Sequence, residues 1–187
     1  TGKYGIDLGN VNLEDLLREL VKIEGLYRLR LASIEINEIT DGIMELIRNN
    51  DIISSHFHIP IQSGSDKILK LMNRKYDRET YLGLIKAARE RMPDISLTSD
   101  IIVGFPGETY EDFLETLRVV KEVKFQALFT FIYSPRNGTP AASMPDPISR
   151  QEKGKWFSEL LAVQEEISKQ NYADYVGTVH TVLCEEV

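Results

Sequence analysis

One pattern occurs twice along the chain: an apolar strand-like run, a short polar loop that contains glycine, and then an amphipathic helix. It spans His56 to Met72 and again Ser96 to Leu117. In α/β proteins, ligands bind and chemistry takes place at the carboxyl ends of parallel strands. The repeated pattern therefore predicts an α/β fold and directs attention to the loops that follow the strands.

Strand-like and helix-like runs alternate along the rest of the chain as well. We expect strands at residues 27–34, 56–61, 95–103 and 127–134, and helices at residues 13–23, 40–48, 66–72, 77–91, 109–123 and 149–172. Asn12 and Asp77 are expected helix caps, and Ser149 with Glu152 fits a capping box. Strict alternation predicts right-handed βαβ units and a parallel sheet. Four strands cannot close a barrel, so the sheet is either small and open or part of a larger one.

Composition narrows the class of protein. The chain has 187 residues, of which 42% are hydrophobic and 27% charged, as in a soluble domain with one core. No apolar run approaches the roughly 20 residues that span a bilayer, and the first residues lack a signal-like pattern. We therefore expect a cytoplasmic protein without membrane contacts. A net charge of −7 disfavours broad nucleic-acid binding by this segment but leaves room for a local basic patch.

The ends and the cysteine content suggest a piece of a longer protein. The chain starts without Met, and it ends in an alternating, strand-like run that stops abruptly. Cys184 is the single cysteine, which excludes an internal disulfide and a multi-cysteine metal site built from this chain alone.

Each expected strand carries polar residues near its carboxyl end. The pairs are Ser33 with Glu35, Gln62 with Ser63, Ser99 with Asp100, and Tyr133 with Ser134. The Gln62 amide offers both a donor and an acceptor, and Ser65 or Asp66 caps the next helix. Such a loop suits a ribose, a carboxylate or an amide, although a plain helix-start loop explains the same residues equally well.

The second loop contributes a buried acid and a glycine turn. Asp100 lies among apolar and small residues, where an unpaired carboxylate is costly, so we expect it to bind a ligand or join a network. Gly104 would allow a flat ring to lie on residues 102–104, and a turn that simply packs is the alternative. Glu108 and Glu111 near the helix start disfavour a phosphate site there.

His56 and His58 alternate in one strand and face the same side. No third ligand follows at a suitable spacing, so we interpret them as hydrogen-bonded strand residues and predict no metal ligands.

Three linked motifs carry a resemblance to a known family. HIPIQSGSDKILKLMNRKY, TSDIIVGFPGET and FTFIYSPRNGTPAA, in this order, resemble the MiaB-like tRNA methylthiotransferase family of radical S-adenosylmethionine enzymes over almost the whole chain. The resemblance implies that residues 1–147 are the carboxyl-terminal part, about four βα units, of an incomplete (β/α)6 TIM-like barrel. Residues 148–175 would be its last helix, and residues 176–187 the truncated start of a β-rich TRAM domain.

The resemblance also implies an activity for the full-length protein. Such enzymes cleave S-adenosylmethionine at a four-iron four-sulfur cluster and add a methylthio group to a modified adenosine beside the tRNA anticodon. The run from Ser33 to Glu35 resembles the branch that acts on N6-threonylcarbamoyladenosine rather than on isopentenyl-adenosine. Two alternatives stay open: a non-catalytic α/β binding module, and a radical enzyme that modifies a ribosomal protein. A CxxxCxxC motif upstream of this chain would separate the enzymes from the module.

The departures from the family are the cluster cysteines. The CxxxCxxC loop and the three cysteines of the family's amino-terminal domain are missing, so we predict that this chain binds no cluster, holds no catalytic residue and is inactive alone. The residues expected to bind S-adenosylmethionine are Ser33, Glu35, Gln62, Ser63, Ser65, Asp100, Ile102, Gly104, Tyr133 and Ser134. Without the preceding strands, residues 27–34 form an open edge, which predicts self-association unless residues 2–8 cover it.

Overall fold

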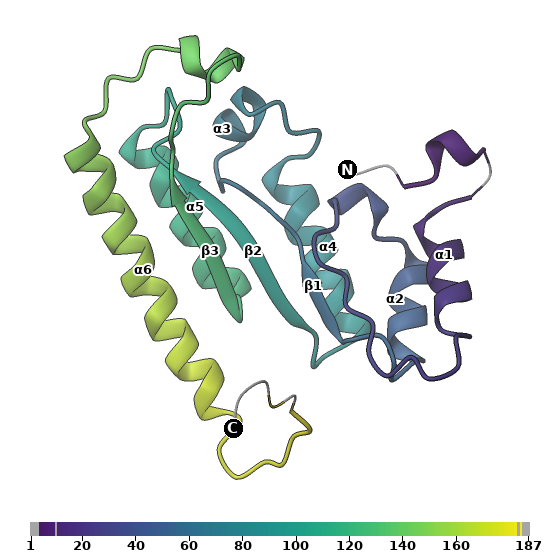
Figure 1. Cartoon of the computed structure of the whole chain (residues 1–187). Helices are drawn as coiled ribbons and strands as arrows, with labels where there is room; N and C mark the ends of the chain where they lie inside the picture. The colour runs from purple at the N-terminus through teal and green to yellow at the C-terminus, as the bar shows by residue number, and fades with distance from the viewer. Residues whose placement is uncertain (1–3, 10, 183, 185–187) are drawn as a thin grey trace.

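The fold is a parallel three-stranded sheet with helices packed on one face (Figure 1). The computed structural model describes residues 4–9, 11–182 and 184. Strands β1 (His56–His58), β2 (Ser96–Val103) and β3 (Ala127–Ile132) lie side by side in the order β1-β2-β3. The predicted α/β class and parallel sheet are confirmed, with three of the four expected strands.

The helices begin where the sequence places their capping residues. They are α1 (Leu13–Leu20), α2 (Asp41–Arg48), α3 (Asp66–Leu71), α4 (Arg78–Arg91), α5 (Tyr110–Val123) and α6 (Arg150–Ala173), with short 3-10 helices η1 (Ile6–Leu8), η2 (Ile36–Glu38) and η3 (Pro140–Ser143). Ser149 accepts the Glu152 amide at the start of α6, but the expected reciprocal bond of a capping box is not formed. The Glu152 carboxylate instead accepts from Lys155 and Trp156 within the helix.

The expected strand at residues 27–34 is not a strand in the structure. It is an extended segment that meets β1 and the residues before it only near its two ends. Leu29 exchanges backbone hydrogen bonds with Ile52 and Ser54 at 2.8 Å, and the Ile34 amide donates to the His58 carbonyl at 3.1 Å. The isolated bridge at Leu29 is parallel, as expected for this sheet. One bridge does not make the ladder of a strand.

The predicted cover of this edge by residues 2–8 can be followed only in part, because residues 2 and 3 lie outside the described chain. The Tyr4 amide donates to the Glu38 carboxylate at 2.8 Å, beyond the end of the edge segment. Along the segment itself, Tyr27 is 75% exposed and Ser33 is also exposed. Self-association through this edge stays a prediction.

The two faces of the sheet differ because side chains alternate along each strand. Phe57, Leu97 and Ile101 are buried in the core that includes residues of α4, α5 and α6. The opposite face carries His58, Asp100 and Phe129, and no helix lies over it in Figure 1. Side chains on this open face are therefore available to a ligand or to another part of a larger protein.

The carboxyl-terminal segment shows no strand among its described residues, 176–182 and 184. Residues 183 and 185–187 lie outside the described chain, so the start of a TRAM domain and the division of the chain at residues 147 and 175 stay predictions. Within the described part, no helix combines the length and the hydropathy needed to cross a membrane.

Candidate functional site

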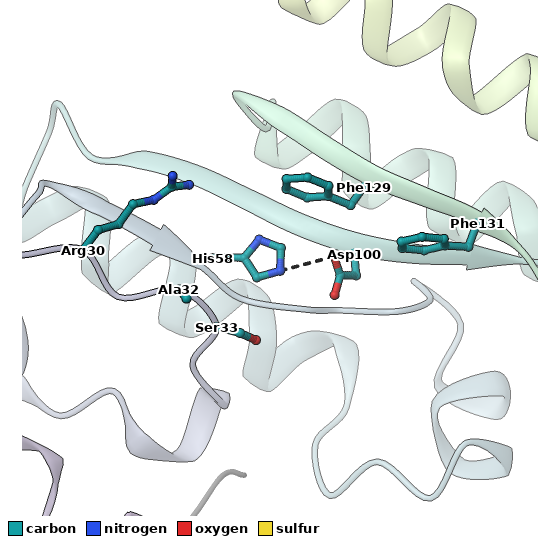
Figure 2. Close-up of a pocket in the computed structure, with 7 residues that line it drawn as sticks. All are labelled: Arg30, Ala32, Ser33, His58, Asp100, Phe129 and Phe131. Carbon is teal, nitrogen blue, oxygen red and sulfur yellow. Dashed lines mark ion pairs between the residues drawn. The ribbon is translucent and has the colours of Figure 1, made fainter. Parts of the chain in front are cut away.

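A cavity of about 390 Å³ lies on the open face of the sheet (Figure 2). The three strands and the extended edge segment contribute its lining residues, which are Arg30, Ala32, Ser33, His58, Asp100, Phe129 and Phe131. The register explains this grouping, because His58 lies opposite Thr98 and Asp100 opposite Phe129. Of the ten predicted cofactor-binding residues, Ser33 and Asp100 line this cavity.

A contact between His58 of β1 and Asp100 of β2 lies at the centre of the cavity. His58 Nε2 is 3.2 Å from Asp100 Oδ1, and His58 Nδ1 is 2.9 Å from the Thr98 hydroxyl oxygen. A ring nitrogen that faces a carboxylate carries its hydrogen, because two lone pairs would repel each other. In a neutral His58 ring, Nδ1 is then the acceptor of the Thr98 hydroxyl hydrogen. His58 thus engages one Asp100 oxygen, and the second oxygen points away from the ring (Figure 2).

The Thr98 hydroxyl connects this pair to His56. His56 Nε2 is 3.0 Å from Thr98 Oγ1 and 3.5 Å from Arg30 Nη2, a group that can only donate. His56 Nδ1 is buried and has no hydrogen-bond partner among the described residues. Burial, with a further contribution from the Arg30 charge, lowers the pKa of His56 to about 4. Both histidines are hydrogen-bonded within the sheet, as the sequence indicated.

Two phenylalanines give the cavity an apolar side. Phe129 and Phe131 are 52% and 53% exposed, which is high for aromatic side chains of a strand. The Phe129 ring packs edge-on against the His58 ring, with 5.4 Å between the centroids. Asp100 lies between His58 and Phe131 in Figure 2, so the free carboxylate oxygen is next to an exposed aromatic surface.

Gln62 is held in an unusual conformation at the end of the first strand–loop unit. Its φ angle is +69°, in the left-handed region that a non-glycine residue occupies at a cost of about 1 kcal/mol or more. The backbone is fixed there by bonds to β2: the Gln62 backbone amide donates to the Asp100 carbonyl at 2.8 Å, and the Ile102 backbone amide donates to the Gln62 carbonyl at 2.9 Å. Among the described residues, the buried Gln62 side chain has no hydrogen-bond partner, so its amide is available to a ligand.

The predicted ligand residues Ser63 and Ser65 join the loop to α5. Ser63 is fully buried, and its hydroxyl accepts the Ser65 amide at 3.2 Å. Ser65 caps α3 and donates to Asp112 of α5 at 2.8 Å. Gly64 is required by this packing, since a Cβ there would lie 2.6 Å from the backbone of Thr116. These bonds agree with the interpretation of a helix-start loop, and binding of S-adenosylmethionine by Ser63 and Ser65 stays a prediction.

Gly104 and Glu108 close the second loop on itself. Gly104 has a φ of +75°, and a Cβ there would overlap the Lys153 side chain of α6. The space beside this glycine is thus filled by a lysine stem, and the expected flat ring cannot lie against that side of Gly104. The Glu108 carboxylate accepts the Gly104 amide and is 2% exposed. Burial raises the pKa of Glu108 to about 7.

Tyr133 packs under the same loop. Its ring contacts Phe105 edge-on at 5.1 Å between centroids, and Lys153 Nζ lies 5.6 Å from the ring centre. Lys153 is itself buried and pairs with Asp146 at 2.5 Å. The Tyr133 hydroxyl is buried without a hydrogen-bond partner among the described residues, so it could accept or donate to a bound ligand.

The other predicted residues lie apart from the cavity. Glu35 ends the edge segment and pairs with Arg74 at 3.5 Å. Ser134 is exposed after β3, and Ile102 is half-buried on the open face, where it is in register with Phe131. The sequence reasoning missed five cavity-lining residues: Arg30, Ala32, His58, Phe129 and Phe131. Their two-residue spacing along the expected strands was the signal that could have placed them on one face with Asp100.

Grouped metal ligands are missing from the part of the chain that the structure describes: no three or more His, Cys, Asp or Glu side chains could hold an ion together. Cys184 is exposed near the end of the chain. The residues present therefore do not fit a four-iron four-sulfur cluster, which needs several thiolates.

Comparison with known proteins defines the class. The sequence model of the radical SAM superfamily matches residues 4–120, which is more than half of the chain. The chain therefore belongs to the radical SAM superfamily.

Curated relatives narrow this class. The chain is 44% identical, over 98% of its length, to the tRNA-2-methylthio-N(6)-dimethylallyladenosine synthase of Acetivibrio thermocellus. It is 46% identical over 98% of its length to the protein of the same name from Thermoanaerobacter pseudethanolicus. The resemblance to MiaB-like tRNA methylthiotransferases is confirmed. The chain spans 38% and 39% of the length of these two relatives.

Solved structures support the same fold. Coproporphyrinogen III oxidase from Escherichia coli, a radical SAM enzyme, matches 83% of this chain and 36% of that chain, with a TM-score of 0.63 and 26% identity. A radical S-adenosylmethionine methyltransferase from Kitasatospora setae, with cobalamin and a [4Fe-4S] cluster bound, matches 75% of this chain and 28% of that chain, with a TM-score of 0.58. At 18% identity, the second likeness shows the fold alone. Both confirm the prediction of part of a radical SAM barrel.

Proposed function

We propose that this chain is part of a cytoplasmic tRNA methylthiotransferase that modifies an adenosine beside the anticodon. The observation that carries the proposal is the 44–46% identity, over nearly the whole chain, to proteins named for methylthiolation of N6-dimethylallyladenosine in tRNA. These names make N6-dimethylallyladenosine the first substrate to test. N6-threonylcarbamoyladenosine, which the run from Ser33 to Glu35 predicts, is the second.

The open face of the sheet fits one wall of an S-adenosylmethionine site. Gln62 offers an amide without an internal partner, the buried Tyr133 hydroxyl is likewise unpaired, and Asp100 has a carboxylate oxygen directed away from His58. We expect these three residues to bind the polar groups of the cofactor and Ile102 to contact its apolar parts. Bound S-adenosylmethionine would supply the radical chemistry of the family. The residues of this wall would hold the cofactor and orient it for that chemistry.

This chain alone should bind no iron-sulfur cluster and should be inactive, because it contains one cysteine. The cluster would belong to other parts of the full-length protein. Iron and sulfide determination after anaerobic reconstitution of this chain should give no stoichiometric cluster. A stoichiometric yield would contradict the inference.

The proposal is tested with the full-length protein that contains this chain, after its cluster has been reconstituted. The protein is incubated with S-adenosylmethionine, a reductant and tRNA that carries either N6-dimethylallyladenosine or N6-threonylcarbamoyladenosine, and the nucleosides are analysed by mass spectrometry. We expect the methylthio derivative of the first nucleoside. Methylthiolation of the second alone would assign the other branch, and no product on either tRNA would refute the proposal.

The two alternative functions give different results in related assays. A radical enzyme that modifies a ribosomal protein would leave tRNA unchanged and add mass to that protein. A non-catalytic module would change neither. The identity to tRNA methylthiotransferases favours neither alternative.

Self-association through the edge segment is a separate prediction. Between Leu29 and Ile34, residues 30–33 form no backbone hydrogen bond with another residue that the structure describes, and an open edge pairs readily with another chain. Light scattering at high protein concentration should give a mass above that of the monomer. A monomeric mass would contradict the prediction.

A further inference from the structure

The segment at residues 66–78, which forms α3 and the turn to α4, is positively charged on an acidic protein. It holds five of the 22 Lys and Arg residues and two of the 29 Asp and Glu residues, so its net charge is +3. The rest of the chain carries 17 positive and 27 negative charges, a net charge of −10. This segment is therefore the local basic patch for which the overall charge leaves room.

Ion pairs within the protein engage two of these five cations. Lys67 pairs with Asp112 of α5 at 2.6 Å, and Arg78 pairs with Glu115 of the same helix. The other three cations form a surface that we name the α3 basic patch: Lys70, Arg74 and Lys75.

The α3 basic patch keeps most of its capacity to bind an anion. The exposed Lys70 ammonium has no partner among the residues that the structure describes. Lys75 donates to the neutral side-chain amide of Asn73 at 2.7 Å, which leaves the lysine charge uncompensated. Arg74 lies 3.5 Å from the Glu35 carboxylate, farther than the ~2.7–2.9 Å of a strong charge-assisted bond. Its guanidinium has further donors for a second anion.

Hydrogen bonds fix the backbone that carries the patch. Asn73 has a φ of +59°, and the Arg74 backbone amide donates to the Leu69 carbonyl at 2.9 Å, which ends α3. The Tyr76 hydroxyl donates to the Pro60 carbonyl at 2.8 Å. A surface on such a fixed frame loses little backbone freedom when a partner binds.

The patch lies beside the loops that follow the strands. Figure 1 shows α3 at the end of the sheet where the strands finish. Leu71, at the end of α3, is next to the loop after β2, since a Cβ at Gly107 would lie 3.3 Å from it. Arg74 contacts Glu35 just beyond the edge segment. A large substrate that reaches the strand ends would therefore pass the patch.

A nucleic-acid backbone is the partner that these features favour. Clustered Lys and Arg side chains bind successive phosphates and release their counterions. A membrane-binding surface combines its cations with exposed apolar side chains, whereas Leu71, at 39%, is the single large apolar side chain that is exposed in residues 66–78. The patch therefore fits a phosphodiester chain better than a lipid surface.

We propose that the α3 basic patch binds the phosphate backbone of RNA and holds it beside the ends of the strands. The choice of tRNA as that RNA rests on the proposed function. The charge, the fixed frame and the position of the patch do not depend on it.

Salt dependence of binding tests the proposal. The affinity of the full-length protein that contains this chain for an unmodified tRNA transcript is measured by fluorescence anisotropy at several salt concentrations. Each phosphate contact contributes about 0.7–0.9 to the slope of log K against log salt concentration. Lys70→Gln/Lys75→Gln should therefore lower the slope by about 1.5 and weaken binding about tenfold or more at ~0.1 M salt. Arg74→Gln should also lower the slope, and Arg74→Lys, which keeps the charge, should not.

Lys86→Gln/Lys169→Gln is the matched control. It removes the same charge from exposed lysines of α4 and α6, which pair with Glu90 and Glu165 on their own helices. Because distant surface charges are screened, the control should change the affinity by no more than about twofold and leave the slope unchanged. Urea denaturation should give the same midpoint for the lysine variants and the unaltered protein, since these side chains are exposed.

The proposal is overturned if Lys70→Gln/Lys75→Gln weakens tRNA binding no more than the control or keeps the original slope. It is also overturned if Arg74→Gln and Arg74→Lys give the same slope. Vesicles of phosphatidylserine and phosphatidylcholine should not bind the protein in sedimentation. Vesicle binding that the double variant loses, without binding of tRNA, would assign the patch to a membrane and refute the proposal.

The outcomes separate this inference from the proposed function, because binding of an unmodified transcript does not require methylthio transfer. An active methylthiotransferase whose double variant binds tRNA like the control would refute the patch alone. Patch-dependent tRNA binding by a protein that produces no methylthio nucleoside would refute the proposed function alone.

Discussion

Two buried titratable residues should make opposite contributions to the pH dependence of stability. Burial raises the pKa of Glu108 from 4.5 to about 7, whereas burial and the Arg30 charge lower the pKa of His56 from 6.5 to about 4. Their side chains lie at opposite ends of the sheet, since His56 begins β1 and Glu108 follows β2 by five residues. Their contributions can therefore be separated by substitution.

The sign of each contribution follows from proton binding. The folded protein holds a proton on Glu108 that the unfolded chain releases above pH 4.5, so the stabilisation from Glu108 is complete below pH 4.5 and is lost as pH rises to about 7. His56 is neutral when folded, so its protonation in the unfolded chain opposes folding at low pH, and this penalty disappears as pH rises from about 4 to 6.5. A tenfold change in proton affinity corresponds to about 1.4 kcal/mol, so each contribution is about 3 kcal/mol. The two nearly cancel over this range in the unaltered protein.

The test compares the free energy of unfolding of three proteins, measured by urea denaturation from pH 4.5 to 7.5. Relative to the unaltered protein, Glu108→Gln should gain about 3 kcal/mol of stability across this range, because the glutamine amide stays neutral while His56 still titrates. His56→Gln should lose a similar amount as pH rises. Constant offsets from the substitutions do not matter, since the slope with pH is measured. A Glu108→Gln profile parallel to that of the unaltered protein would refute the burial assigned to Glu108.

Three further predictions concern a glycine turn, a buried ion pair and a helix cap, and the same denaturation assay checks them. Gly104→Ala should lose about 2 kcal/mol or more, since its φ is positive and a Cβ would overlap Lys153; Gly83→Ala, at an open position of α4, should instead gain about 0.5–1 kcal/mol. Equal effects at the two glycines would contradict this packing. Asp146→Asn should lose about 2 kcal/mol or more because the buried Lys153 charge loses its partner, and adding Lys153→Met should restore part of that loss. No restoration would argue against the ion pair. Ser65→Ala should lose about 1 kcal/mol with the α3 cap, and an unchanged stability would show that the cap and the bond to Asp112 contribute nothing.

Local rules predicted much of the fold from the sequence. Caps at Asn12, Asp77 and Ser149 each accept an amide at the start of a helix, because capping depends on residues only three positions apart. The segment at residues 27–34 shows the limit of pattern reasoning. Its apolar alternation fits a strand, but a ladder requires a partner that bonds along its length. The described backbone bonds of this segment are to Ile52 and Ser54 at Leu29, and to His58 of β1 at Ile34.

In the candidate site, too, local rules predicted some features, and contacts between distant residues decided the others. Asp100 was recognised because a lone carboxylate in an apolar strand needs a partner, and that partner is His58. The role of Gly104 could not be predicted, because Lys153 fills the space beside it from a helix far along the chain. Ser65 has the pattern of a ligand-binding loop, yet its hydroxyl bonds to Asp112 of α5. Contacts between residues distant in sequence decide which polar groups remain for a ligand.

The most direct measurement is the nucleoside content of tRNA from a strain that lacks the gene encoding this chain. The proposed function predicts loss of the methylthio derivative of N6-dimethylallyladenosine and accumulation of its unmodified precursor, with recovery when the gene is restored. Unchanged methylthio nucleosides in the deletion strain, measured by mass spectrometry, would contradict the assignment of this chain to a tRNA methylthiotransferase.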